Sequence, residues 1–345
     1  LYYSLLYWAR MVAWDDRSAI ATINVIGILF ATGTAIWISM RSDLLGLACA
    51  GIAAFLLSGP TQLFASEARG YSLALSITFL ASWYVAVLIQ DPSRRPNNMA
   101  LAGVGVVAAL AHVYTALFAG SLAAGMLALT LFKGRKNLFW PGLVLGVSTS
   151  MVFLAWFSSV AGALTSILWI EFSLRSIYQA ISYVVHVSAG GWLNAILLAA
   201  LLVLGVGIKT TRQLFLAFGT AFLVFALFPV VVSFHTPIVY GRYWLVGTPA
   251  IIVVVFFAMR AWTLDALKWP DRRSPAMAAL GALVFVCGST ASGFAAGYGI
   301  ASGKKGWAGA KVVRPLIHSC PEHSIHVASV AIGPFRTFTW GFARM

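Results

Sequence analysis

The sequence is poor in charged residues, and acidic residues are the scarcest of them. Of the 345 residues only 9% are charged, with 9 Asp or Glu against 23 Lys or Arg. A soluble domain carries roughly a quarter charged residues. With 61% hydrophobic residues and a mean hydropathy of +0.90, this composition excludes an ordinary soluble enzyme and predicts a polytopic membrane protein.

Cysteine is also scarce, which limits the covalent and metal chemistry open to the chain. Cys49 and Cys287 lie inside apolar runs, and Cys320 lies far from both. No CxxC pair occurs in the sequence. Neither a disulfide framework nor a structural zinc site is therefore indicated.

The formal net charge of +14 could suggest a nucleic-acid partner. The basic residues, however, form short clusters between apolar runs, which is typical of membrane topology rather than of a nucleic-acid groove. We therefore expect the lipid bilayer, and no nucleic acid, as a partner.

Ten apolar runs are interpreted as membrane spans. They are Ala19–Met40, Leu44–Leu57, Tyr71–Ile89, Met99–Val113, Thr115–Phe132, Leu138–Val160, Trp192–Ile208, Leu214–Phe234, Tyr243–Trp262 and Ala276–Tyr298. The uncharged stretch 99–132 is divided in two because one helix of that length would reach about 50 Å, well beyond a hydrocarbon core of about 30 Å. Basic clusters lie before and after this stretch, so if both are cytoplasmic an even number of spans separates them, and the turn is expected at His112.

Positive charge assigns the two sides of the membrane. Twelve of the 23 basic residues fall in loops that are each two spans apart, which makes those loops cytoplasmic. They are Arg41, Arg94, Arg95, Lys133, Arg135, Lys136, Lys209, Arg212, Arg260, Lys268, Arg272 and Arg273. All six histidines then fall on the external side, together with both chain ends.

Three segments complete the expected organisation. Residues 1–18 are aromatic and too short to span, which favours an external interfacial helix. The bundle covers 19–298, and its external connection 161–191 has apolar residues at helical spacing that predict amphipathic helices on the membrane. Residues 299–345 resemble the opening of an external α/β segment that is too short to bury a core of its own.

The stretch Ser58–Leu73 carries unusual charge for its position. Glu67 and Arg69 lie between two apolar runs, after a Gly59-Pro60 break. Charged groups at the end of a span usually face a cavity, a partner or a ligand head group. The simpler alternative is that Arg69 anchors the span at the lipid head groups.

Three external positions combine an aromatic hydroxyl with Arg or His. They are Ser66–Tyr71 (SEARGY), His112–Tyr114 (HVY) and Tyr240–Tyr243 (YGRY). A guanidinium group offers a planar fork of donors for phosphate oxygens, and tyrosine can both donate a hydrogen bond and line an apolar slot. This combination would suit a polyprenyl phosphate, which has an anionic head and a long hydrocarbon tail.

The order of these elements resembles a known family. The segments LYYSLLYWAR, GPTQLFASEARGYSLAL, LAHVYTALFAG and YGRYWLVGTPAIIVV are similar to the membrane glycosyltransferases of the C fold (GT-C), and more narrowly to the bacterial protein-mannosyltransferase and aminoarabinose-transferase-like group. The resemblance implies an all-α, multi-pass protein of the bacterial inner membrane. It also implies an extracytoplasmic reaction that passes a sugar from a polyprenyl-phosphate carrier to a protein, lipid or glycan acceptor.

The resemblance also implies roles for individual residues. It places Arg69, Tyr71, Arg242 and Tyr243 at the lipid phosphate and His112 and Tyr114 at the cavity. From their external positions, His235 and Tyr240 are further candidates for the cavity and acceptor. The catalytic Asp of the family's first external loop is expected upstream of Leu1, which leaves Asp15, Asp16 and Glu67 as weak candidates. Glu67 and His235 are the candidate ligands for a divalent metal ion.

Two other functions remain open at this point. A transporter or lipid-sugar flippase would also use many spans and a charged cavity, although it often has related halves. A polymerase or ligase of envelope polysaccharide would share the donor, but it needs a large external loop with several arginines. The 161–191 connection has only Arg175.

Overall fold

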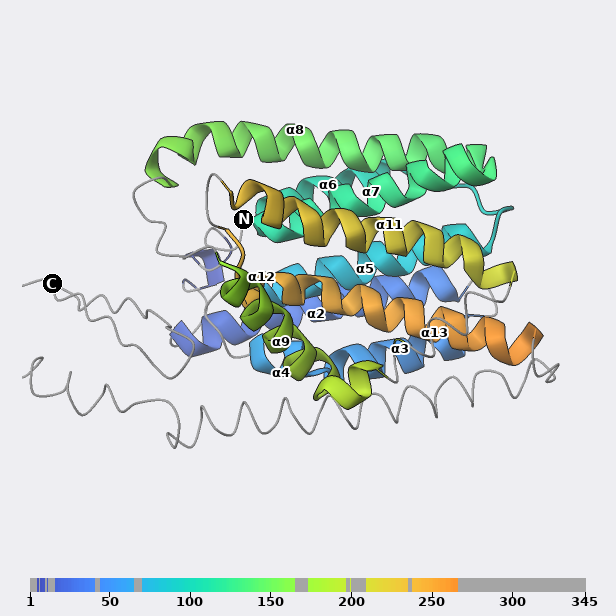
Figure 1. The fold of residues 1–345 in the computed structure, drawn as a ribbon, viewed down its shortest axis with the longest axis horizontal. Helices are drawn as coiled ribbons and strands as arrows, with labels where there is room; N and C mark the ends of the chain where they lie inside the picture. The colour runs from blue at the N-terminus through green and yellow to red at the C-terminus, as the bar shows by residue number, and fades with distance from the viewer. Residues whose placement is uncertain are drawn as a thin grey trace, which may run out of the picture. The chain divides into compact units, whose positions relative to one another are not determined.

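The computed structural model describes residues 5, 7–9, 11, 16–40, 44–64, 70–164, 173–196, 199, 209–234 and 238–265, and these residues include no strand. The α-helices are α2 (Asp16–Ser39), α3 (Leu45–Leu57), α4 (Gly59–Phe64), α5 (Tyr71–Gln90), α6 (Asn98–Ala111), α7 (Val113–Lys133), α8 (Phe139–Leu164), α9 (Leu174–Ala189), α11 (Lys209–Val232), α12 (Gly241–Trp244) and α13 (Thr248–Asp265). Two 3₁₀ turns, η1 (Lys136–Leu138) and η2 (Leu245–Gly247), complete the set. The long helices run side by side (Figure 1).

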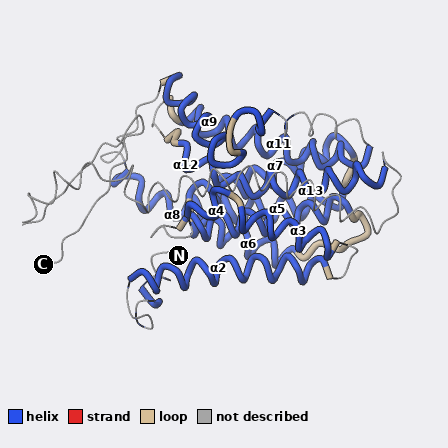
Figure 2. Tube along the Cα trace, turned by 90° about the horizontal axis from the view of Figure 1, so that it is seen from below, coloured by secondary structure: helices blue, strands red, loops and turns tan. Residues whose placement is uncertain are grey.

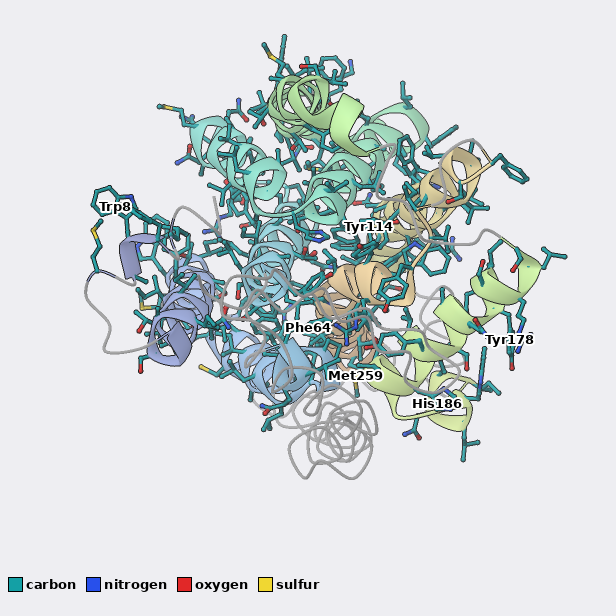
Figure 3. All side chains as sticks on the ribbon, turned by 90° about the vertical axis from the view of Figure 1, so that its left-hand side faces the viewer. Trp8, Phe64, Tyr114, Tyr178, His186 and Met259 are labelled. Carbon is teal, nitrogen blue, oxygen red and sulfur yellow. The ribbon has the colours of Figure 1, made fainter. Side chains whose placement is uncertain are left out.

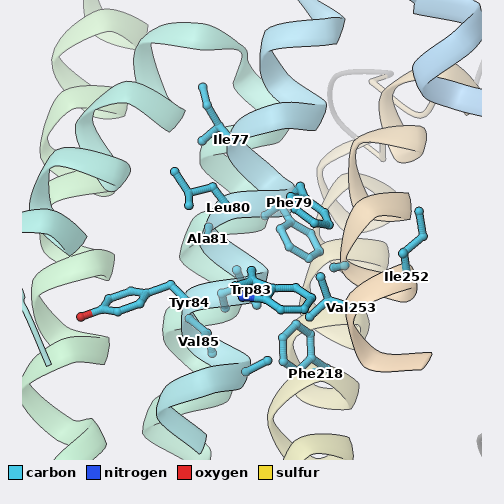
Figure 4. Packing of buried hydrophobic residues seen from close by; sticks show 14 of the residues in the cluster. Ile77, Phe79, Leu80, Ala81, Trp83, Tyr84, Val85, Phe218, Ile252 and Val253 are labelled. Atoms are coloured by element: carbon cyan, nitrogen blue, oxygen red, sulfur yellow. The ribbon is translucent and has the colours of Figure 1, made fainter. Parts of the chain in front are cut away.

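Helix α5 is the central element of this bundle. Every residue from Tyr71 to Ile89 is buried, and α5 packs against α2, α13, α7 and α6. Trp83 lies at its middle beside Phe79 (Figure 4). Its ring also contacts Phe257, and its indole N–H donates to Ser39 Oγ at 2.9 Å. A long apolar helix without a polar face is expected to lie in the middle of a bundle.

Six helices are long and apolar enough to cross a membrane: Ser18–Ser39, Tyr71–Gln90, Val113–Lys133, Lys136–Ala155, Thr211–Val232 and Gly241–Ala261. Large apolar side chains are exposed along the outer helices. Examples are Leu29 and Phe30 on α2, Met151 and Leu154 on α8, and Leu223 and Leu227 on α11. Exposed apolar stripes of this length are typical of surfaces that face lipid. Figure 2 shows the all-helical arrangement.

The expected division of residues 99–132 is confirmed. Helix α6 ends at Ala111 and α7 begins at Val113, with His112 in an extended conformation between them. The expected break at Gly59-Pro60 was only partly right, because Gly59 begins the short helix α4 after a single linking residue, Ser58. Proline is tolerated in a first helical turn because its missing N–H has no partner there.

Several expectations fall where the structure gives no description. They are the span 276–298, most of the span 192–208 and the segment 299–345. Of the expected interfacial helix 1–18, residues 5, 7–9, 11 and 16–18 are helical, the last three of them in α2. The count of ten spans and the C-terminal α/β segment therefore stay predictions.

Two arginines tie helix ends together at the end of the bundle where α5 stops. Arg135 donates to the Ile89 carbonyl at 3.0 Å and to Gln213 on α11, and Arg94 donates to the Ile38 carbonyl at 2.9 Å. These groups satisfy the last carbonyls of α5 and α2, which have no partner within their own helices. Burial lowers the pKa of Arg135 from its ordinary value, but an arginine remains charged at neutral pH.

Candidate functional site

An aromatic cluster forms at the opposite end of the bundle, where α5 begins. Tyr243 of α12 lies at its centre, with ring centroids 4.8 Å from Tyr114, 5.3 Å from Tyr240, 5.6 Å from His112 and 6.4 Å from Tyr71. The Tyr71 and His112 rings are 5.1 Å apart. We call these five residues the Tyr/His cluster. Residues from positions 71 to 243 of the sequence are thus brought together by the first turns of α5, α7 and α12.

His112 has a defined structural role in the cluster. Its Nδ1 accepts a hydrogen bond from the Tyr114 backbone N–H at 3.2 Å, so His112 is the N-cap of α7. In the neutral imidazole one ring nitrogen accepts and the other carries the proton. The cap therefore leaves the proton on Nε2, and His112 can offer an N–H donor to a ligand.

Burial also keeps His112 neutral. It lowers the pKa of His112 to about 4 from an ordinary value of 6.5, because a buried site disfavours the charged imidazolium. Protonation of Nδ1 would in addition remove the acceptor that caps α7. His112 is thus poorly placed to act as a general base, which would need a free ring nitrogen near neutral pH.

This assignment predicts how stability depends on pH. Because the pKa in the folded state lies below the unfolded value, the unfolded chain takes up the proton first, and stability falls as pH drops from about 6.5 towards about 4. Asparagine is a good N-cap and does not titrate. We expect His112→Asn to lose less thermal stability than the wild type between pH 7 and pH 4.5. Equal losses in the two proteins would show that His112 does not titrate in this way.

The segment leading into α12 is held by two hydroxyl groups. The Tyr114 hydroxyl donates to the Ile238 carbonyl at 2.5 Å. Ser233 Oγ accepts from the backbone N–H groups of Ile238 and Val239 at 2.9 and 3.2 Å. These bonds bracket the connection between α11 and α12 and fix where Tyr240 enters the cluster.

The predicted residue Arg242 lies in α12 next to the centre of the cluster. It is half-buried and stands between Gly241, which is buried, and Tyr243. Gly241 is needed here because a Cβ atom at this position would lie 2.9 Å from Tyr183 Cδ1 and 3.1 Å from the Ala180 carbonyl oxygen of α9. The close approach of α12 to α9 therefore sets the position of Arg242.

The structure does not describe all of the predicted site. It brings together Tyr71, His112, Tyr114, Tyr240 and Tyr243, and their roles in binding stay predictions. Glu67, Arg69, Asp15 and His235 are not among the described residues. Asp16 is described only as the first residue of α2, in the first helical turn that acidic residues favour.

No described group of three or more His, Cys, Asp or Glu residues could hold a metal ion. Both predicted metal ligands, Glu67 and His235, belong to segments without a description. A divalent metal therefore stays a prediction. The five residues of the Tyr/His cluster include no carboxylate, which is the ligand that hard divalent cations favour.

Sequence reasoning missed four residues that shape the cluster. Phe64 stacks on Tyr71 with centroids 4.6 Å apart, and Phe225 meets Tyr114 edge to face at 6.1 Å. Ser233 and Gly241 act through the backbone contacts described above. Phe64 could have been predicted because it lies three residues before Glu67 of the EARGY element. The roles of Phe225, Ser233 and Gly241 depend on contacts between distant segments, which the local sequence does not indicate.

Comparisons with known proteins give no direct guide to this site. No protein-family model, curated protein or solved structure matches the chain.

Proposed function

We propose that this chain is an integral membrane glycosyltransferase that moves a sugar from a polyprenyl-phosphate carrier to an acceptor on the external side. One observation carries the proposal: residues singled out for phosphate and sugar contact gather in the Tyr/His cluster, next to Arg242, at one end of a bundle of membrane-length apolar helices. A polyprenyl phosphate places its charged head at this level and its tail beside the helices.

The residues of the cluster suit the departing phosphate of such a carrier. The Arg242 guanidinium would pair with phosphate oxygens. Tyrosine hydroxyls and the Nε2–H of neutral His112 would add hydrogen bonds as negative charge develops on the leaving group. A carboxylate would act as base on the acceptor hydroxyl; Asp15, Asp16 and Glu67 are the candidates in this sequence.

The rival function is a transporter or flippase for a lipid-linked sugar. Alternating access would require the opposite end of the bundle to open. At that end Arg135 joins α5 to α11 and Arg94 reaches the last turn of α2. These contacts between helices favour a site that is reached from one side only, as a transferase needs.

A binding measurement tests the proposal. Purified protein in nanodiscs is titrated with a polyprenyl phosphate, and we expect Arg242→Ala to weaken binding at least about tenfold, equivalent to about 1.4 kcal/mol. Arg95→Ala is the matched control, because Arg95 is exposed at the other end of the bundle. Equal affinities for the two variants would place the phosphate elsewhere. In a separate assay in liposomes, movement of the carrier between leaflets without sugar transfer would support the transporter.

A further inference from the structure

Helix α9 has 16 residues, packs beside α12 and α4, and is capped at both ends. Ser173 and Ser176 form a reciprocal capping box at its N-terminus, and Gly190 ends it with a φ of 78°. Caps of this kind each contribute about 1 kcal/mol to helix stability. Both ends of α9 are therefore stabilised by its own flanking residues, and α9 is a separate helix.

The residues of α9 divide into three faces. Ala180, Tyr183, Val184 and Val187 face the protein, where α9 packs on α12, α4 and η2. A second apolar stripe, formed by Leu174, Tyr178 and Ile181, is 86%, 61% and 41% exposed. The third face carries the polar side chains Arg175, Gln179, Ser182 and His186. Side chains three and four positions apart share one side of a helix, which gives these groupings.

The stripe borders both other faces. Figure 3 looks along the bundle. It shows Tyr178 and His186 on α9 at the edge of the bundle and Tyr114 nearer its middle. The order around the helix is thus protein, apolar stripe, polar face. A helix at the surface of a bilayer has this order, since one side meets lipid and the next meets water.

The chain after α9 continues the same surface. Gly190 and Gly191, at φ values of 78° and 140°, turn the chain. The helical residues that follow include Trp192, Leu193 and Ile196, which are 42%, 73% and 62% exposed. Tryptophan and tyrosine are the side chains enriched at membrane–water interfaces, and Arg175 is complementary in charge to lipid phosphate.

Helix α9 is also joined to the segment that carries the cluster. Tyr183 and the Ala180 carbonyl lie against Gly241, and Ser188 Oγ is 2.8 Å from Thr248 Oγ1 in a buried hydrogen bond. These two contacts lie on either side of Arg242 and Tyr243. A displacement of α9 would therefore move α12.

We propose that α9 is a bilayer-surface helix whose Leu174–Tyr178–Ile181 stripe lies among lipid head groups and upper acyl chains, and that this lipid contact holds α12 in place. The proposal needs only that the apolar helices lie in a bilayer, and it is independent of the sugar-transfer reaction. Its occupant is the lipid surface, because the exposed stripe contains Tyr178, is followed by the exposed Trp192, Leu193 and Ile196, and lies beside the basic Arg175.

Fluorescence quenching tests the lipid contact. Single-cysteine proteins, with the three native cysteines replaced, carry a fluorophore at Leu174→Cys, Ile181→Cys or Ser182→Cys in liposomes. We expect lipids with a quencher high on the acyl chain to quench positions 174 and 181 at least twofold more than position 182, and aqueous iodide to give the reverse order. Iodide quenching of all three, or protection of 174 and 181 from both quenchers, would overturn the proposal in favour of water or a protein partner.

A charge substitution tests the link to α12 without a label. Ile181→Glu places a carboxylate in the stripe, whereas Ser182→Glu places it on the adjacent polar face. In nanodiscs we expect Ile181→Glu to lower the melting temperature by several degrees more than Ser182→Glu. In detergent micelles, which can rearrange so that the carboxylate stays hydrated, we expect the two variants to have similar melting temperatures. Equal effects in nanodiscs would contradict a lipid-facing stripe.

Discussion

Replacing Gly125 by alanine is expected to destabilise the bundle more than any other single-methyl change in α7. A Cβ atom at position 125 would overlap the Ala217 carbonyl oxygen of α11. Because the atom it meets belongs to the backbone, no side chain can rotate away. We expect a loss of about 3 kcal/mol, at the upper end of the range for overpacking, and a lower melting temperature in fluorescence-detected gel filtration after heating.

Gly120 provides the matched control for this prediction. It lies on the same helix, and a Cβ atom there would meet nothing within 4 Å. Since alanine is a better helix former than glycine by up to about 1 kcal/mol, Gly120→Ala should be neutral or stabilising. Similar melting temperatures for the two variants would contradict the close contact between α7 and α11.

The second large effect is expected at Tyr243. Its ring contacts the four other members of the Tyr/His cluster. Aromatic pairs contribute about 0.5–1.5 kcal/mol beyond the area they bury, so Tyr243→Ala should lower stability by about 3 kcal/mol and abolish binding of polyprenyl phosphate. Tyr243→Phe should keep the ring contacts of the cluster but weaken binding about tenfold, because only a hydrogen-bonding group is lost.

Tyr84 serves as the control for loss of a hydroxyl group. Its oxygen accepts from the Asn97 backbone N–H at 2.7 Å, at the other end of the bundle. Tyr84→Phe should cost about 1 kcal/mol of stability and leave binding unchanged. If Tyr243→Phe behaved in the same way, the cluster would be a packing feature and not a binding site.

The sequence allowed the helices to be predicted because their apolar runs are long and are separated by charge. Counting basic loops correctly divided residues 99–132 at His112, where composition alone shows one continuous run. The gathering of Tyr71, His112 and Tyr243 followed in outline from their common place at span ends. Their ring contacts did not, since the depth at which each helix begins is set by packing.

Other features depend on contacts between distant segments. The close approach of α7 to α11 at Gly125 could not be predicted from the neighbouring sequence. An isolated glycine in an apolar run is equally compatible with open space, as at Gly120. The role of His112 as a helix cap also required the structure. From the sequence, His112 was expected at a turn, but the pattern did not show which backbone group it would cap.

The most direct test of the lipid-phosphate site is photocrosslinking with a polyprenyl phosphate that carries a diazirine on its first isoprene unit. The protein in nanodiscs is irradiated, and the labelled peptides are identified by mass spectrometry. We expect labels within 70–75, 112–118 and 238–246, with competition by unlabelled carrier. Labels spread evenly along the exposed faces of α2, α8 and α11, or gathered near Arg94 and Arg135, would contradict a phosphate site at the Tyr/His cluster.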